Sequence, residues 1–146
     1  MRKSIKNYTS EVPVNRSLQN IQDILARAGA QKIMMDYDST RNVSAIVFGL
    51  EIEGKGFVPF TLPVNVEKLA TVLYKTDFNR LDEKRKEQAR RTAWKNIHDW
   101  IDAQMALIET EMAKVQQVFL PYVVTGQNKT LYDSYMEGRL LPEGTS

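Results

Sequence analysis

A run of basic residues between positions 84 and 95 carries the clearest chemical signal in this chain. Lysine and arginine are the side chains that neutralise phosphate groups when a protein binds nucleic acid. Such contacts reach the backbone and not the base edges, so they position a nucleic acid without reading its sequence. Six residues form the run and two from predicted loops extend it: Lys84, Arg85, Lys86, Arg90, Arg91 and Lys95, with Arg41 and Lys55. The structural alternative is the solvated polar face of a surface helix.

Other reactive side chains are too few to predict an active site. His98 is the only histidine in the chain, and it lies near Asp99 and Asp102 without a second histidine or a His-Glu-x-x-His pattern. Asp36 and Asp38 have the spacing of some magnesium sites, but capping of a turn by Asp38 explains the pair. The chain contains no cysteine, which excludes disulfides, thiolate zinc sites and cysteine nucleophiles. We therefore expect no enzyme, no metal site and no cofactor.

The basic run belongs to a long helix predicted over residues 79–112. This stretch has no glycine or proline, and its apolar residues recur at steps of three and four. Asn79 is the predicted N-cap, with Asp82 three residues later as in a capping box. Beyond that turn the charges oppose the helix dipole, because basic residues fill the N-terminal half and acidic residues the C-terminal half. Such a departure from local stability favours a functional role for the basic half.

The sequence before this helix predicts one helix and an antiparallel sheet. The helix begins at Asn15 or Ser17, presents a single apolar face, and ends where Gly29 suits a helix C-terminus. Alternating apolar residues, separated by turn-forming residues, then predict strands. The predicted strands are 31–37, 43–53 and 57–62, with a short edge strand at 8–14.

The remaining segments complete the predicted fold. Asn65 caps a short helix that ends near position 75. After position 112 the long helix is expected to continue until Pro121 stops it, followed by a turn at 125–128 and a short helix from 131 to 136. The fold class is therefore α+β, with a three-stranded antiparallel meander covered by the N-terminal helix and the long C-terminal helix.

Length and composition fit one globular domain. The chain has 146 residues, of which 42% are hydrophobic and 26% charged, which suffices for a core of its own. We expect a single domain over residues 1–146, with a possible basic arm at 1–10 and a loose tail at 142–146. The net charge is only +2, so attraction to nucleic acid must come from local clustering. No signal peptide or membrane span is recognisable, which favours a cytoplasmic protein.

The predicted long helix exceeds the length that a small sheet can cover. Its 34 residues would span about 50 Å. We expect the excess to pack on a second copy of the chain, with Trp94 and Trp100 as candidate contacts, so the sequence predicts a homo-oligomer. The alternative is that both tryptophans belong to the core.

Several short segments resemble a family of short proteins from phages, prophages and viral metagenomes. They are spread over nearly the whole chain: 12–14 (VPV), 17–22 (SLQNIQ), 65–67 (NVE), 93–94 (AW), 99–101 (DWI), 103–106 (AQMA), 119–122 (FLPY) and 130–132 (TLY). No activity or site residue comes with this resemblance. It implies a phage-type setting inside a bacterial host, where small proteins serve replication and recombination or disarm host defences.

Two functions follow as expectations. The first is a non-enzymatic accessory protein that binds nucleic acid through the basic half of the long helix. The alternative is an anti-defence protein that inhibits a host defence protein or sequesters a nucleotide signal. A purely structural oligomer is the third possibility.

Overall fold

A computed structural model of the chain describes residues 5–138. Its contacts divide the chain into two compact units, each built from two separate segments. Unit 1 comprises Met1–Leu25 and Val64–Met105, and unit 2 comprises Ala26–Pro63 and Ala106–Ser146. The expectation of a single domain stays a prediction. The expected tail at 142–146 and the first four residues of the expected basic arm lie outside the described residues.

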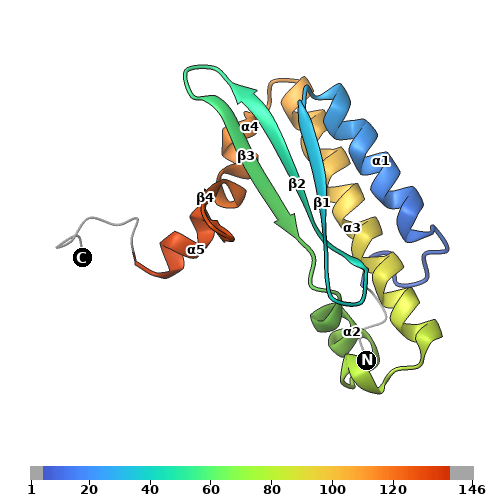
Figure 1. The fold of residues 1–146 in the computed structure, drawn as a ribbon. Coiled ribbons are helices and arrows are strands. Elements are labelled where there is room, and N and C mark those ends of the chain that lie inside the picture. Colours follow the sequence, from blue (N-terminus) through green and yellow to red (C-terminus); the bar gives the residue numbers. More distant parts are fainter. Residues whose placement is uncertain (1–4, 139–146) are drawn as a thin grey trace. The chain divides into compact units, whose positions relative to one another are not determined.

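Unit 1 is helical. Helix α1 (Val14–Arg27) buries the apolar face expected from its sequence, which consists of Leu18, Ile21, Ile24 and Leu25. Most of α1 lies beside α3 (Glu83–Glu109), the longest helix of the chain (Figure 1). Gly29 follows α1 with a φ of 99°, a left-handed conformation that glycine adopts without steric cost.

Unit 1 also contains α2 (Val66–Tyr74) and the 3-10 turn η1 (Phe78–Arg80). As predicted, Asn65 caps α2, because its Oδ1 accepts a hydrogen bond of 2.9 Å from the Lys68 amide. A small apolar cluster joins this region to the start of α3. It consists of the buried residues Ala70, Leu81 and Ala89, with Val66, Leu69, Tyr74 and Phe78 packed against them.

The long helix begins four residues later than predicted. Asn79 lies in η1 and is not the N-cap. Asp82 takes that role, since its Oδ1 accepts a hydrogen bond of 2.9 Å from the Arg85 amide. The burial of Leu81 explains the difference, because the chain must turn before α3 to place this side chain in the apolar cluster. At 27 residues, α3 spans about 40 Å, and the expected homo-oligomer stays a prediction.

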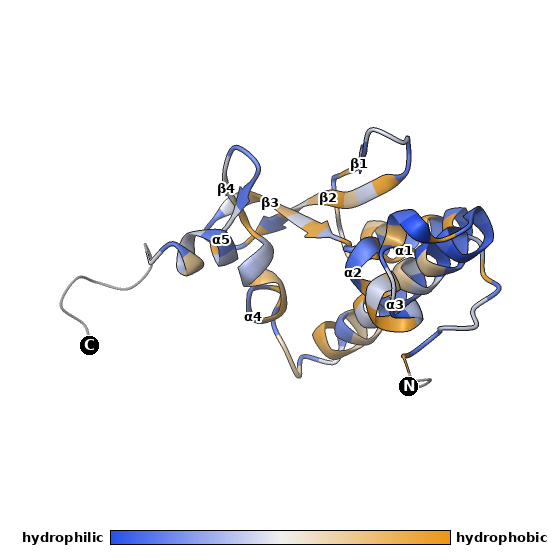
Figure 2. Cartoon of the chain, turned by 90° about the horizontal axis from the view of Figure 1, so that it is seen from below, coloured by the Kyte–Doolittle hydropathy of each residue, from blue (hydrophilic) through white to orange (hydrophobic). Residues whose placement is uncertain are grey.

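Unit 2 contains the predicted three-stranded antiparallel meander. Its strands are β1 (Lys32–Tyr37), β2 (Val43–Ile52) and β3 (Gly56–Pro63), in the order β1-β2-β3. The central strand buries the alternating large apolar residues Ile46, Phe48, Leu50 and Ile52, and the small residues Ala45 and Gly49 between them are buried as well. Much of β2 and β3 is correspondingly hydrophobic (Figure 2). Together with the helices, this sheet confirms the α+β class.

The C-terminal part of unit 2 consists of short elements: α4 (Val115–Phe119), η2 (Leu120–Tyr122), β4 (Val124–Gly126), β5 (Lys129–Thr130) and α5 (Leu131–Met136). Phe119 anchors them, because its ring meets the Phe48 ring edge-on at a centroid distance of 5.6 Å and the Phe60 ring at 6.0 Å. Phe48 and Phe60 are themselves stacked at 5.3 Å. Aromatic pairs of this kind add to the stabilisation from burial.

Two local predictions were wrong. Residues 8–14 do not form a strand, and α1 already begins at Val14. The long helix does not continue to Pro121: it ends at Glu109, and Glu111 adopts a left-handed φ of 62° that no α-helix accepts. The turn predicted at 125–128 is present, and it connects the short strands β4 and β5. Within residues 5–138, no helix has the length and apolar character needed to cross a membrane.

Candidate nucleic-acid interface

The six basic residues of α3 do not share one face. At 3.6 residues per turn, Lys84, Arg91 and Lys95 fall along one side of the helix. Lys86 and Arg90 fall on the roughly opposite side, and Arg85 lies between. The run that looks continuous in the sequence is therefore two groups of cations, whose surroundings differ.

Lys86 and Arg90 converge on one aromatic ring. The Lys86 ammonium lies 5.3 Å from the centroid of the Phe78 ring, and the Arg90 guanidinium carbon lies 5.7 Å from it. These are cation–π distances. Among the described residues, neither cation forms a salt bridge with a carboxylate. Two like charges one helical turn apart repel each other, so this pair is favourable for an added anion.

The first turn of α3 adds two exposed cations. Lys84 and Arg85 are both exposed, and no carboxylate within residues 5–138 pairs with either of them. Arg80, in η1, is likewise exposed. The nearby Asp82 carboxylate already accepts the Arg85 amide as the helix cap.

Lys95 is neutralised by its own helix. Its ammonium lies 2.8 Å from Asp99 Oδ1, and its side chain is only 26% exposed. The Asp99 carboxylate also accepts a hydrogen bond of 2.9 Å from the Asn7 amide and lies 2.9 Å from His98 Nδ1. Burial alone raises the pKa of the Asp99 carboxyl, but the hydrogen bonds from Lys95, Asn7 and His98 hold this pKa well below its ordinary value. Lys95 is therefore a poor candidate for phosphate binding.

Arg91 is also engaged within unit 1. Its Nη2 donates a hydrogen bond of 2.6 Å to Gln88 Oε1. Gln88 in turn donates to the carbonyl oxygens of Tyr8 and Ser10, at 3.1 and 3.0 Å. Thr92 donates to the Asn7 carbonyl at 3.0 Å. This side of α3 thus holds the segment before α1 in place and is less available to a ligand than the side with Phe78.

The two loop residues of the predicted interface belong to unit 2. Arg41 precedes β2 and Lys55 follows it, and both are exposed. The ten residues of β2 span about 33 Å, so Arg41 and Lys55 lie at opposite ends of the sheet and do not form one patch with each other.

The alternative chemistry around the carboxylates has structural explanations. Asp38 Oδ1 accepts hydrogen bonds from the amides of Thr40 and Asn42, at 2.8 and 3.1 Å, as expected for a residue that caps a turn. His98 and Asp99 belong to the network that holds Asn7. In the part of the chain that the structure describes, no group of three or more histidine, aspartate or glutamate side chains is placed to bind a metal ion.

Phe78 and Arg80 were not recognised from the sequence. With Asn79 as the expected N-cap, Phe78 would have preceded a continuous helix. A better signal was Asp82, which lies three residues before Arg85 and leaves Phe78 in the turn that precedes the helix.

Comparison of the chain with models of protein families, with curated proteins and with solved structures gave no match. The resemblance to phage proteins therefore stays a prediction.

Proposed function

We propose that this chain is a non-enzymatic nucleic-acid-binding protein that contacts backbone phosphates through Arg85, Lys86 and Arg90. The observation that carries the proposal is the pair Lys86 and Arg90, which share the Phe78 ring without a carboxylate partner among the described residues. Arg85 extends this cationic surface in the first turn of α3, whereas Lys84 lies on the other side of the helix. Arg91 and Lys95, which have partners in unit 1, play a secondary role.

The physical argument rests on what an anion would gain at this pair. A phosphate placed between two unpaired cations relieves their mutual repulsion and releases counterions from the nucleic acid. A guanidinium stacked on a ring keeps the N–H groups at its edge free, and that edge matches the two oxygens of a phosphate. The cation–π contacts therefore orient the side chains without using up their donors.

The biological setting is part of the proposal. The resemblance of short segments to phage and prophage proteins supports an accessory role in phage replication or recombination, in the cytoplasm of a bacterial host. Contact with phosphates alone predicts binding without sequence preference.

Fluorescence anisotropy with labelled single- and double-stranded oligonucleotides tests the proposal. We expect binding at low salt that weakens steeply as salt rises. Lys86→Glu/Arg90→Glu should weaken binding by roughly tenfold or more and lower the salt slope by about two, since about one counterion is released per phosphate contact.

The matched control is Arg16→Glu/Arg27→Glu, which reverses two exposed charges on α1 and changes the net charge equally. This control should keep most of the affinity. Absence of binding at low salt would refute the proposal. Equal losses in the two double variants would show that only the overall charge matters and would refute the assigned surface.

A further inference from the structure

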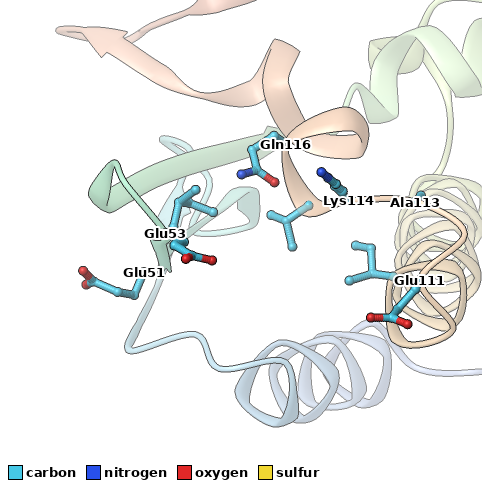
Figure 3. Close-up of a pocket in the computed structure, with 9 residues that line it drawn as sticks. Glu51, Glu53, Glu111, Ala113, Lys114 and Gln116 are labelled. Atoms are coloured by element: carbon cyan, nitrogen blue, oxygen red, sulfur yellow. The ribbon is translucent and has the colours of Figure 1, made fainter.

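Unit 2 contains an open cavity of about 570 Å³. It lies between the end of β2 with its following turn and the segment that leads from the end of α3 into α4 (Figure 3). This volume falls in the range of small-molecule sites. The cavity is independent of the cationic surface in unit 1, and it uses none of the residues proposed there.

The cavity has apolar walls. Ile52 is buried, and Ile108, Ala113 and Val115 are half-buried around it. Such walls favour the hydrocarbon part of a ligand, because contact removes apolar surface from water.

Carboxylates lie on two sides of this apolar space. Figure 3 shows Glu53 on the side of the β2–β3 turn and Glu111 on the side of α3, while the Glu51 side chain is directed away. Lys114 is the one cation among the lining residues. Within the described residues, neither Glu53 nor Glu111 forms a salt bridge. The lining residues therefore carry a net negative charge, because the glutamates outnumber the single lysine.

The end of α3 strengthens this negative potential. The C-terminal end of a helix carries a partial negative charge, which basic residues in the last turn usually compensate. Helix α3 has none there. Ile108 of its last turn lines the cavity. The helix end and the carboxylates therefore both favour a positively charged ligand.

We propose that this cavity binds a small aliphatic diamine. Two carboxylates on opposite sides of an apolar space match two ammonium groups joined by a hydrocarbon chain. Nucleotides are disfavoured, because their phosphates would meet Glu53 and Glu111.

The test is an NMR titration of the full chain, labelled at isoleucine methyl groups, with cadaverine, a five-carbon chain that carries an amine at each end. The methyl signals of Ile52 and Ile108 should shift and saturate, with a dissociation constant on the order of 1 mM for a ligand of this size. Pentylamine has the same chain with one amine and should bind more weakly.

Variants identify the carboxylates. Glu53→Gln and Glu111→Gln should each weaken cadaverine binding roughly two- to fivefold, as expected for loss of an exposed ion pair. Glu67→Gln, at an exposed glutamate of α2, should change nothing. The proposal is overturned if no saturable shift appears, if pentylamine binds as tightly as cadaverine, or if Glu67→Gln weakens binding as much as the cavity variants.

Discussion

The two ends of α3 carry charges of opposite sign, and both oppose the helix dipole. At the start, Lys86 and Arg90 gather over Phe78 in unit 1. At the end, no basic residue occupies the last turn, and Glu111 follows at the cavity of unit 2. Local stability alone would favour the reverse order. The difference shows that a single helix can present unpaired cations at one end and lie beside a cavity lined by glutamates at the other, which is the basis of the two binding proposals.

The two regions are also held in different ways. The cationic surface depends on contacts between side chains, because the Phe78 ring lies against both Lys86 and Arg90. The cavity depends on the course of the backbone, because the left-handed Glu111 ends α3 and Phe119 anchors the following segment. Four predictions test how far each region depends on side-chain contacts or on the course of the backbone.

The largest expected effect concerns the anchor of unit 2. Phe119→Ala should lower the free energy of unfolding by about 3–5 kcal/mol, since a fully buried aromatic ring is replaced by a methyl group. Leu120→Ala, at a neighbouring side chain that is 49% exposed, should cost less than about 0.5 kcal/mol. Urea denaturation measures both. Similar values for the two variants would show that the aromatic cluster does not anchor the segment.

The second prediction concerns the polar network of unit 1. Asp99→Asn should cost about 1–3 kcal/mol, because charged hydrogen bonds with Lys95, Asn7 and His98 are lost. The lowered pKa means that the folded state favours the carboxylate. The contribution of Asp99 is thus complete above about pH 4, the pKa of an unfolded aspartate, and disappears as the pH falls toward the folded pKa.

Thermal unfolding between neutral and acidic pH measures this effect. The stability difference between the parent chain and Asp99→Asn should shrink below about pH 4. Asp102→Asn changes an exposed aspartate of the same helix and serves as the control. A difference that does not change with pH would contradict the assigned charge of Asp99.

The third prediction concerns the left-handed residue at the cavity. Glu111→Gly should raise the free energy of unfolding by about 0.5–1 kcal/mol, because glycine accepts a positive φ without steric cost. Lys75→Gly tests the same effect in unit 1, where Lys75 ends α2 with a φ of 56°. Glu111→Ala keeps the β-carbon and should bring no such gain. Chemical denaturation of the three variants would decide, and a gain in Glu111→Ala would exclude the steric explanation.

The smallest effect concerns the ring beneath the two cations. Phe78→Leu should weaken nucleic-acid binding roughly two- to fivefold, the equivalent of an exposed cation–π contact. Phe57→Leu is the matched control, because the Phe57 ring lies 5.8 Å from the Lys32 ammonium in unit 2. Anisotropy titrations measure both affinities. If Phe57→Leu weakened binding as much as Phe78→Leu, the effect would not be specific to the proposed surface.

Secondary structure could be predicted from the sequence where it depends on a short local pattern. The apolar face of α1, the alternation of β2 and the cap at Asn65 each depend on neighbouring positions, so the sequence predicts them. The boundaries of α3 do not depend on neighbouring positions alone. Its start depends on the burial of Leu81 with Ala70 and Ala89, and its end on a left-handed residue that is not glycine.

The candidate interface shows the same limit. All six basic residues of α3 were named from the sequence, but their partners were not. Lys95 pairs with an acid of its own helix four positions away, a spacing that the sequence displays. The ring that contacts Lys86 and Arg90 belongs to Phe78, which lies in the turn η1. This turn depends on the burial of Leu81 with Ala70 and Ala89, which the sequence does not display.

The sequence by itself determined the α+β class, the order of the main elements and the reversed charge order of the long helix, because these depend on residue type and short spacing. Tertiary structure decided which cations stay without a carboxylate partner among the described residues and where two glutamates meet an apolar cavity. The physical reason is that ion pairs, ring contacts and burial depend on distances between segments remote in sequence. Whether a charged side chain can bind a ligand therefore depends on whether the fold places a partner of opposite charge beside it.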